Sequence, residues 1–417
     1  MKSHELHFDY PPGSVVKTDC LRDVNAGIYP SYYTVLDGTV LASTSVTEII
    51  SHLGDFSINP DYNAMEFANV GSDHDTSLYN RLKAILPPQL KGGIPSSTKL
   101  LARKWTGYEK SWYEGRGTID ERIYRLRPFE EISSMGRNIS FEPDFSLSSD
   151  SKLIKLTAIH LESYINEIER KYPEYHNIIL MGGKDSQIIG LVPKITDSWS
   201  VFSADPNFPL VQKFIKENDI KVEKLYRYDG KNREDRATLT RKMICSDLRA
   251  DPRHIRWRRR LREIADSYDS KCIFWSGTEA DTIFSHFPLY HNQNREEYFS
   301  RHFTRATNFQ GTTHQTTKNF TGCPMISPYH SERFWRTVME HYDPGMISKN
   351  TDLRKRLGER VAGQSVSWPK ANPAPDPYRY DYSVNGYQMY VDYIKSIVND
   401  PRQSVISNRE RQPSDSA

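Results

Sequence analysis

Hydrophobic and polar positions alternate most regularly in the middle of the chain, between about residues 150 and 275. Apolar residues from Leu153 to Ile168 recur at helical spacing, which predicts a long amphipathic helix. Short apolar runs then predict strands at 176–180, 198–204, 222–226 and 271–275. Helices are expected from 186, over 211–218, and as a long helical region over 238–268. This alternation is typical of an α/β fold, a doubly wound parallel sheet with helices on both faces.

The N-terminal part has a different pattern, in which short strand-like runs lie among Tyr, Ser, Asp and Pro residues. The runs 32–36 and 39–43 are rich in strand-favouring residues and are joined by Asp37-Gly38. This arrangement predicts a hairpin with a type I′ turn. A short helix is expected over 47–53.

The Ser-Ser-Asp-Ser stretch at 148–151 is the expected boundary between two domains. Residues 1–150 would form a smaller α+β domain and residues 151–400 the parallel-sheet domain. The polar, charged stretch 401–417 is expected to be a disordered tail. A chain of 417 residues is long enough for two hydrophobic cores.

Composition limits the class of protein without identifying its chemistry. No apolar run approaches the roughly 18 residues that a membrane span needs. The first residues lack the apolar segment of a signal peptide. The four cysteines lie far apart with no Cys-x-x-Cys pair, so neither a zinc site nor a disulfide framework is predicted. We therefore expect a cytoplasmic protein without a membrane partner.

The net charge of +3 is too small to indicate nucleic-acid binding by itself. The exception is local, because arginines crowd around Trp257 at positions Arg253, Arg256, Arg258, Arg259, Arg260 and Arg262. One interpretation is a solvated helix face with Glu263 and Asp266 as acidic neighbours. The other is a site for an acidic or phosphate-rich partner, such as pyrophosphate, a nucleic acid or a peptide.

The first chemical motif follows the strand predicted at 176–180 and reads Met-Gly-Gly-Lys-Asp-Ser over 181–186. Two glycines let the backbone approach a bound group closely, and the N–H groups at a helix start favour an anion. Asp185 adds a carboxylate suited to a phosphate-bound Mg²⁺. The loop lacks the Walker spacing. It resembles the pyrophosphatase loop Ser-Gly-Gly-x-Asp-Ser, with Met181 in place of the first Ser, so one phosphate-facing hydroxyl is absent.

A second motif, Ser-Gly-Thr-Glu-Ala-Asp over 276–281, follows the strand predicted at 271–275. In parallel sheets ligands bind at the carboxyl ends of the strands, where both motifs fall. Asp185 and Asp281 would then form a pair suited to Mg²⁺ on a polyphosphate. The alternative is that both residues are helix N-caps.

The two motifs belong to a larger resemblance over about 175–380, roughly half the chain. The chain resembles the synthetase domain of the asparagine synthetase/β-lactam synthetase superfamily, which also includes lasso-peptide cyclases. The resemblance rests on four segments in order: 182–186, 276–281, 326–334, and 353–357 followed by Trp368-Pro369-Lys370. It implies a sheet of the HUP/PP-loop type that binds ATP and Mg²⁺.

The resemblance also implies roles for individual residues. Asp185 and Asp281 would hold Mg²⁺, and Lys370 would stabilise charge on the adenylated intermediate or on pyrophosphate, with Asp185 and Glu279 also in catalytic positions. The nucleotide would contact Leu180, Gly182, Gly183, Lys184, Asp185, Ser186, Phe202, Ser203, Ser276 and Gly277.

Three positions depart from the family pattern. Thr278 stands where the family has an acidic residue, and Glu279 beside it would need a shifted backbone to substitute. Pro324 and Ser331 also replace acidic residues. These changes remove candidates for the base that deprotonates an attacking amine.

The N-terminal region is similar to a decayed class II amidotransferase domain, through Gly27–Tyr33 and Ile123–Pro128. Glutamine-hydrolysing members carry Cys directly after the initiator Met, whereas this chain has Lys2. Its only cysteine in this region is Cys20. Because an N-terminal Cys is the nucleophile of that glutaminase, we expect no glutamine hydrolysis here.

The expected function is an ATP-dependent, AMP-forming ligase that joins a small-molecule or peptide carboxylate to an amine donor. One alternative is a nucleobase- or tRNA-modifying enzyme of the PP-loop type, for which the arginine cluster would suit RNA. The other is a non-catalytic nucleotide-binding protein, motivated by Met181, Thr278 and Pro324.

Overall fold

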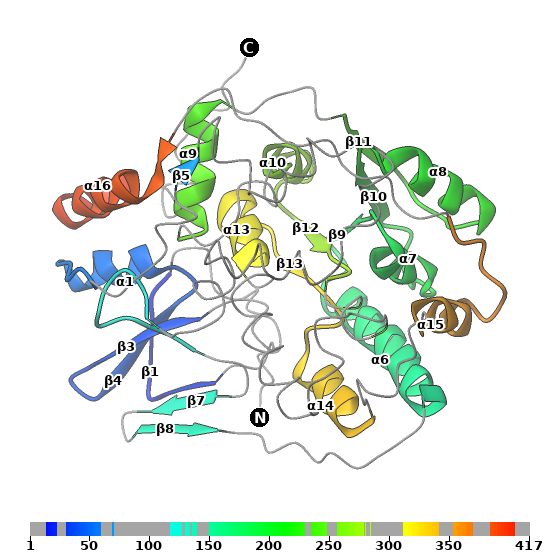
Figure 1. The fold of residues 1–417 in the computed structure, drawn as a ribbon, viewed down its shortest axis with the longest axis horizontal. Helices are drawn as coiled ribbons and strands as arrows, with labels where there is room; N and C mark the ends of the chain where they lie inside the picture. Colours follow the sequence, from blue (N-terminus) through cyan, green and yellow to red (C-terminus); the bar gives the residue numbers. More distant parts are fainter. Residues whose placement is uncertain are drawn as a thin grey trace, which may run out of the picture.

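The computed structural model describes somewhat more than half of the chain. The described residues are 14–22, 31–59, 69–70, 117–126, 130–133, 136–139, 150–229, 235–247, 257–278, 280, 284, 312–341, 353–369 and 384–404. Figure 1 shows their arrangement, with a parallel sheet and its helices beside an antiparallel β layer.

The parallel sheet has five strands in the order β11-β10-β9-β12-β13. They are β9 (His176–Leu180), β10 (Trp199–Ala204), β11 (Leu225–Tyr228), β12 (Cys272–Trp275) and β13 (Met325–Ile326). Every neighbouring pair is parallel. This confirms the predicted parallel α/β sheet, although β11 begins at Leu225 rather than at 222.

Helices cover both faces of this sheet because successive strand residues point to opposite sides. Ile179, Val201 and Ile273 share one core with buried residues of α6 (Asp150–Lys171), α7 (Lys184–Leu191), α8 (Phe208–Glu217), α14 (Glu332–His341) and α15 (Leu353–Ala362). Ile178 and Phe274 face a second core with α10 (Arg258–Asp266). Helix α13 (Thr312–Thr321) packs beside α10.

The long helical region predicted over 238–268 is divided in the structure. Its first described helix, α9 (Arg236–Cys245), ends in a turn at Ser246 and Asp247, and α10 starts only at Arg258. Asp247 has a positive φ of 49°. Its buried carboxylate accepts hydrogen bonds from Gln315 and Tyr390. Tertiary contacts therefore end a helix that the local pattern would continue.

The N-terminal layer is antiparallel. One sheet has the order β1 (Val16–Thr18), β4 (Thr39–Ser43), β3 (Tyr32–Leu36) and β6 (Tyr124–Arg125), and a second joins β2 (Cys20–Arg22), β7 (Glu130–Ser133) and β8 (Gly136–Ile139). Asp37 and Gly38 both have positive φ, so the predicted type I′ hairpin between β3 and β4 is confirmed.

The C-terminal end of the described chain returns to this layer. Helices α1 (Val46–Leu53), α9 and α16 (Gly386–Asn399) share one core. The short strand β14 (Val384–Asn385) pairs with β5 (Asn69–Val70). Residues 401–403 form the 3₁₀ helix η6, and the buried Ser404 donates a hydrogen bond to Glu48. The first part of the predicted disordered tail is thus folded, and 405–417 lie outside the described residues.

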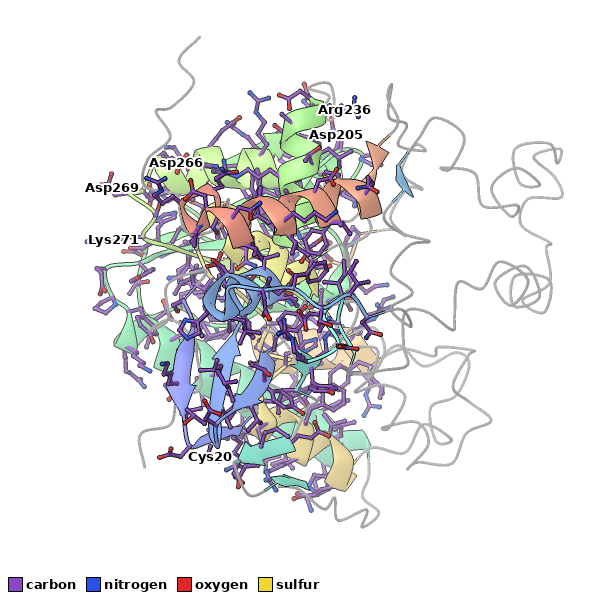
Figure 2. The ribbon with its side chains drawn as sticks, turned by 90° about the vertical axis from the view of Figure 1, so that its left-hand side faces the viewer. Cys20, Asp205, Arg236, Asp266, Asp269 and Lys271 are labelled. Atoms are coloured by element: carbon purple, nitrogen blue, oxygen red, sulfur yellow. The ribbon has the colours of Figure 1, made fainter. Side chains whose placement is uncertain are left out.

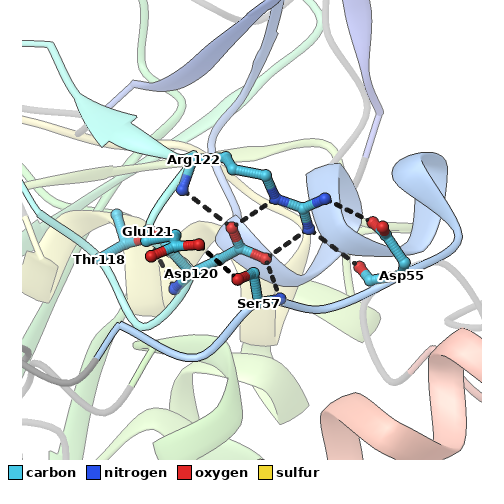
Figure 3. A network of polar contacts seen from close by, with 6 residues as sticks. All are labelled: Asp55, Ser57, Thr118, Asp120, Glu121 and Arg122. Atoms are coloured by element: carbon cyan, nitrogen blue, oxygen red, sulfur yellow. Dashed lines mark hydrogen bonds and ion pairs between the residues drawn. The ribbon is translucent and has the colours of Figure 1, made fainter.

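A compact ionic network joins the end of α1 to the segment before β6 (Figure 3). Arg122 holds the carboxylate of Asp120 through two hydrogen bonds, at 3.0 Å from Nε and 2.8 Å from Nη2. It also donates to Asp55 at 2.7 Å, and the backbone N–H of Ser57 donates to Asp120 at 3.0 Å. We call Asp55, Ser57, Asp120 and Arg122 the Asp120 cluster.

Candidate functional site

The candidate site lies where the strand order reverses. Along the chain the sheet grows from β9 through β10 to β11, and it then resumes on the other side of β9 with β12. The connections after β9 and β12 therefore leave the same edge in opposite directions, which opens a crevice at their carboxyl ends. Both predicted motifs follow these two strands.

The loop after β9 is shaped by its own serine. Gly183 is the extended N-cap residue of α7, and as a glycine it has no side chain that could cap the helix. The Ser186 hydroxyl accepts a hydrogen bond from the Gly182 N–H at 3.0 Å and donates to the Gly183 carbonyl at 3.1 Å. Helix α7 begins at Lys184, two residues before the predicted start. The start of α7 is therefore formed by two glycines, and its N-cap residue contributes no capping side chain.

Met181 has a structural role that the motif comparison did not indicate. Its side chain is buried in the core shared by α6 and α7. Its Cε lies 2.8 Å from the position that a Cβ on Gly190 would occupy. The Met181 side chain therefore packs into the core.

The two strand-end loops touch through their backbones. A Cβ on Gly277 would lie 2.3 Å from the backbone nitrogen of Ser186 and 2.4 Å from the carbonyl carbon of Asp185. No real side chain can occupy such a position. Glycine is therefore required at 277 by direct contact between the two motifs.

Two further segments reach Asp185. The Tyr329 hydroxyl, from the segment before α14, donates to the backbone carbonyl of Asp185 at 3.4 Å. Burial, and then the charge of Asp185, hold the pKa of Tyr329 well above its ordinary value. Nη1 of Arg354, on α15, lies 3.1 Å from Oδ1 of Asp185. We call Asp185, Gly277, Tyr329 and Arg354 the Asp185 cluster.

The residues expected to line the nucleotide pocket lie beside this cluster. Leu180 ends β9, and Phe202 and Ser203 lie near the end of the neighbouring β10. Ser203 is buried, and its hydroxyl has no hydrogen-bond partner within the described part of the chain. An unsatisfied buried hydroxyl at a strand end is consistent with a polar ligand there.

Asn207 was missed by the sequence analysis. Its Nδ2 lies 3.6 Å from the position of a Cβ on Gly182, so its side chain adjoins the glycine loop. Its buried Oδ1 has no partner among the described residues. The available signal was its place directly after β10, in the Asp-Pro-Asn turn at the carboxyl edge of the sheet.

Thr278, which replaces an acidic residue of the family pattern, belongs to a hydroxyl–imidazole cluster. Ser276 donates to its hydroxyl at 3.2 Å, and Nε2 of the buried His314 lies 3.3 Å from that hydroxyl. Ser327 donates to its carbonyl at 3.1 Å. His314 lies on α13, which has no regular apolar stripe, so the sequence offered no signal for it.

Several predicted site residues lie outside the described part of the chain. They are Glu279, Asp281 and Lys370. The distance between Asp185 and Asp281 is therefore not described. The described residues contain no group of three or more His, Cys, Asp or Glu side chains placed to hold a metal ion.

Cys20 lies away from this site. It is an exposed residue of β2, and burial and the charge of Glu131 raise its pKa, which does not favour a nucleophilic thiolate. Figure 2 shows it at the opposite end of the view from Asp205, the residue that follows β10.

The arginine cluster is divided between the surface and the interior. Arg259 and Arg260 are exposed and contact Glu263, and Arg262 lies 3.8 Å from Asp266. The acidic neighbours Glu263 and Asp266 lie as the solvated-face interpretation predicts, but Arg262 is only 23% exposed. Arg258 is fully buried, which that interpretation did not anticipate. Arg253 and Arg256 lie outside the described residues.

No protein-family model matches the chain, and no curated protein sequence matches it. Among the described helices, none combines the length and the apolar character needed to cross a bilayer. Function is therefore inferred from the residues and their geometry.

Proposed function

We propose that this protein is an ATP-dependent ligase that forms an amide with release of AMP and pyrophosphate. The observation that supports the proposal best is the convergence at Asp185. Residues of four segments, 182–186, 276–277, 326–334 and 353–357, meet there although they are far apart in sequence. These are segments on which the resemblance to asparagine and β-lactam synthetases rests.

ATP would bind across the carboxyl ends of β9 and β10. Gly182 and Gly183 would allow the triphosphate to approach the backbone, and the N–H groups at the start of α7 would favour its negative charge. Lys184 would neutralise phosphate charge. Leu180, Phe202 and Ser203 would contact the adenine and ribose, and the buried Ser203 hydroxyl, which lacks a partner among the described residues, supports a polar ligand there.

Mg²⁺ would be held by Asp185 together with Asp281 and would neutralise charge on the triphosphate. Mg²⁺ usually takes one or two carboxylates plus phosphate oxygens, so a preformed cluster of acidic side chains is not needed. Arg354 already contacts Oδ1 of Asp185. An arriving phosphate would compete for this guanidinium, which would free the carboxylate for the metal.

The proposed reaction has two steps. A carboxylate oxygen of the first substrate attacks the α-phosphorus of ATP, and the bond to the pyrophosphate oxygen breaks. An amine then attacks the acyl carbon, AMP leaves, and the nitrogen loses a proton to a base. Lys184 and Lys370 would stabilise the charge that develops on the phosphates.

The N-terminal layer would act as a scaffold or as a docking surface for substrate. Cys20 is an internal residue of β2, whereas glutamine hydrolysis of this type uses an N-terminal thiol. We therefore expect the purified protein to release no ammonia from glutamine. The amine donor would enter as a free amine or as part of the carboxylate substrate, which would give a ring.

Exchange of labelled pyrophosphate into ATP tests this proposal, because exchange requires reversible adenylation of a carboxylate. Wild-type protein, Asp185→Asn and the matched control Asp120→Asn would be assayed with Mg²⁺ and a panel of amino-acid and peptide carboxylates. We expect exchange in the wild type and the control, and at least a ~100-fold loss in Asp185→Asn, as for removal of an electrostatic stabiliser.

Calorimetry with ATP and Mg²⁺ separates the remaining outcomes. ATP uptake without exchange for any carboxylate would favour a non-catalytic nucleotide-binding protein. The absence of ATP binding would contradict both the ligase and the non-catalytic nucleotide-binding protein. Adenylation of RNA, rather than of a carboxylate, would favour a nucleobase-modifying enzyme.

A further inference from the structure

Cationic side chains of α9 and α10 surround one aromatic ring on α13. The charged groups of Arg241, Lys242 and Arg262 lie 5.6, 5.7 and 5.9 Å from the ring centroid of Phe320. Figure 1 shows these three helices side by side, apart from α7 and α15, and α10 and α13 pack together. Phe320 is itself buried. Positive charge is thus concentrated around a position inside the protein.

Arg258, on α10, is a further cation close enough to Lys242 for the two charges to interact. Its side chain is 0% exposed. Its Nε, Nη1 and Nη2 atoms have no hydrogen-bond partner within the described residues, and its contact is with the ring of Trp257, 5.2 Å away. Burial lowers the pKa of Arg258 to about 9. A guanidinium has five N–H donors, and none of the three nitrogens that carry them is satisfied here.

The surroundings increase the cost of this charge. Burial, and then the charges of Arg258 and Arg259, lower the pKa of Lys242 well below its ordinary value. The acidic residues of α10, Glu263 and Asp266, are half exposed and face Arg259, Arg260 and Arg262. Contacts with aromatic rings offset part of the cost, but they provide no acceptor for the N–H groups. A buried cation without an acceptor is strongly unfavourable.

An anion would satisfy the N–H groups of Arg258, which lack a partner among the described residues. We infer that Arg258, with Lys242 beside it, binds the phosphate group of a small anionic ligand between α9, α10 and α13. A guanidinium matches two phosphate oxygens in its plane, and an ammonium adds a point charge. The enclosed position of Arg258 suits a small ligand, because the backbone of a nucleic acid could not reach it.

This phosphate site is distinct from the loops around Asp185. Helix α10 packs on the face of the sheet opposite to α7. Along α13, His314 contacts Thr278 of the strand-end site, whereas Phe320 lies six residues further, about 9 Å along the helix axis. The inference does not depend on the proposed ligase activity.

Thermal unfolding of the full chain tests the inference, with inorganic phosphate as the probe and chloride at equal ionic strength as the reference. We expect phosphate to raise the Tm of the wild type by about 2–4 °C or more. Arg258→Met should have a higher Tm than the wild type in chloride, because an uncompensated buried charge is removed, and it should lose the response to phosphate. Arg259→Met, an exposed neighbour on the same helix, should respond like the wild type.

Two further variants keep the test decisive. If Arg258→Met does not fold, Lys242→Met should weaken phosphate binding at least ~10-fold in calorimetry, as expected for a lost charge-assisted contact. Lys184→Met should leave the phosphate response intact. A wild-type Tm equal in phosphate and chloride would overturn the inference, and so would a response abolished by Lys184→Met but retained by Arg258→Met. Neither result bears on pyrophosphate exchange, so the two proposals fail separately.

Discussion

Two Asp–Arg pairs in this protein have the same chemistry but different surroundings. In the Asp120 cluster the carboxylate is fully buried, and Arg122 contacts both of its oxygens, at 3.0 and 2.8 Å. In the Asp185 cluster Nη1 of Arg354 lies 3.1 Å from Oδ1 of Asp185, and the side chains of Arg354 and Asp185 are 18% and 23% exposed. The first pair is local, because Asp120 and Arg122 are two positions apart, whereas the second joins α7 to α15 across 169 positions.

The difference separates a structural ion pair from a candidate site. Burial alone would raise the pKa of the Asp120 carboxyl, but hydrogen bonds from Arg122 and Ser57 outweigh it and lower that pKa. Both oxygens of this carboxylate already accept hydrogen bonds within the protein, so Asp120 is not a candidate for binding a ligand. Asp185 is partly exposed to solvent and lies in the first turn of α7, whose N-cap residue is a glycine. A bound phosphate could compete with Asp185 for the guanidinium of Arg354. An Asp–Arg pair therefore indicates a functional site only when the carboxylate is exposed and its arginine partner can be exchanged for a ligand.

Among the substitutions proposed here, Gly277→Ala should have the largest effect, because it should disrupt the Asp185 cluster. The new Cβ would overlap the backbone of Asp185 and Ser186, which cannot rotate away as a side chain could. We expect the free energy of unfolding to fall by about 3 kcal/mol and ATP binding to be lost, measured by urea denaturation and calorimetry. Gly182→Ala is the matched control for stability, since its Cβ would meet only an ordinary contact at 3.6 Å. Equal stability of both variants would contradict the close approach.

Mild acid should weaken the side of the molecule that holds Tyr329 while the Asp120 cluster stays intact. His160 is buried on α6, and its Nε2 lies 2.9 Å from the carbonyl oxygen of Pro328, the residue before Tyr329. Burial lowers the pKa of His160 from 6.5 to about 4. Between these values the unfolded chain takes up a proton that the folded protein does not, so stability falls as the pH falls from 6.5 towards 4.

The full loss is about 3 kcal/mol, because each pKa unit corresponds to 1.36 kcal/mol. Urea denaturation at pH 7 and pH 4.5 would measure most of it, and His160→Gln should show a flatter dependence on pH. Asp120 is protonated less readily than an ordinary aspartate over this range, because burial raises its pKa less than the hydrogen bonds from Arg122 and Ser57 lower it. A pH dependence unchanged by His160→Gln would show that other groups account for it.

Substituting Asp120 and Asp185 in turn compares the two clusters directly, and each substitution should affect stability less than the changes above. Asp120→Asn should lower the free energy of unfolding by about 1–3 kcal/mol, because it weakens buried, charge-assisted hydrogen bonds, and should leave ATP affinity within about twofold. Asp185→Asn should cost less than about 1 kcal/mol, as for a partly exposed pair, and should weaken ATP–Mg²⁺ binding at least ~10-fold. Urea denaturation and calorimetry measure both quantities. The reverse pattern would exchange the roles assigned to the two clusters.

Local patterns in the sequence were sufficient for the elements and for the edge of the sheet where the site lies. Asp37-Gly38 specifies its hairpin because a two-residue type I′ turn needs two positive φ values. The strands at 176–180 and 271–275 were predicted nearly to the residue, since each is a short apolar run ended by a turn. The glycine loop after β9 was found in the same way.

Long-range contacts could not be predicted from such patterns. The end of α9 depends on Asp247, whose partners Gln315 and Tyr390 are distant in sequence. The partner of Asp185 is Arg354, which lies 169 positions away. The burial of Arg258 could not be distinguished by sequence from the exposure of Arg259 on the same helix, because only packing decides which arginine is buried.

The sequence by itself determined the parallel sheet, the β3–β4 hairpin and the two strand-end loops, because backbone preferences and hydrophobic periodicity act over a few residues. Only the tertiary structure decided that Gly277 presses on Asp185, that Arg354 and Tyr329 meet it, and that Arg258 is enclosed. Those contacts depend on how distant segments fill the same space, and no local pattern encodes that.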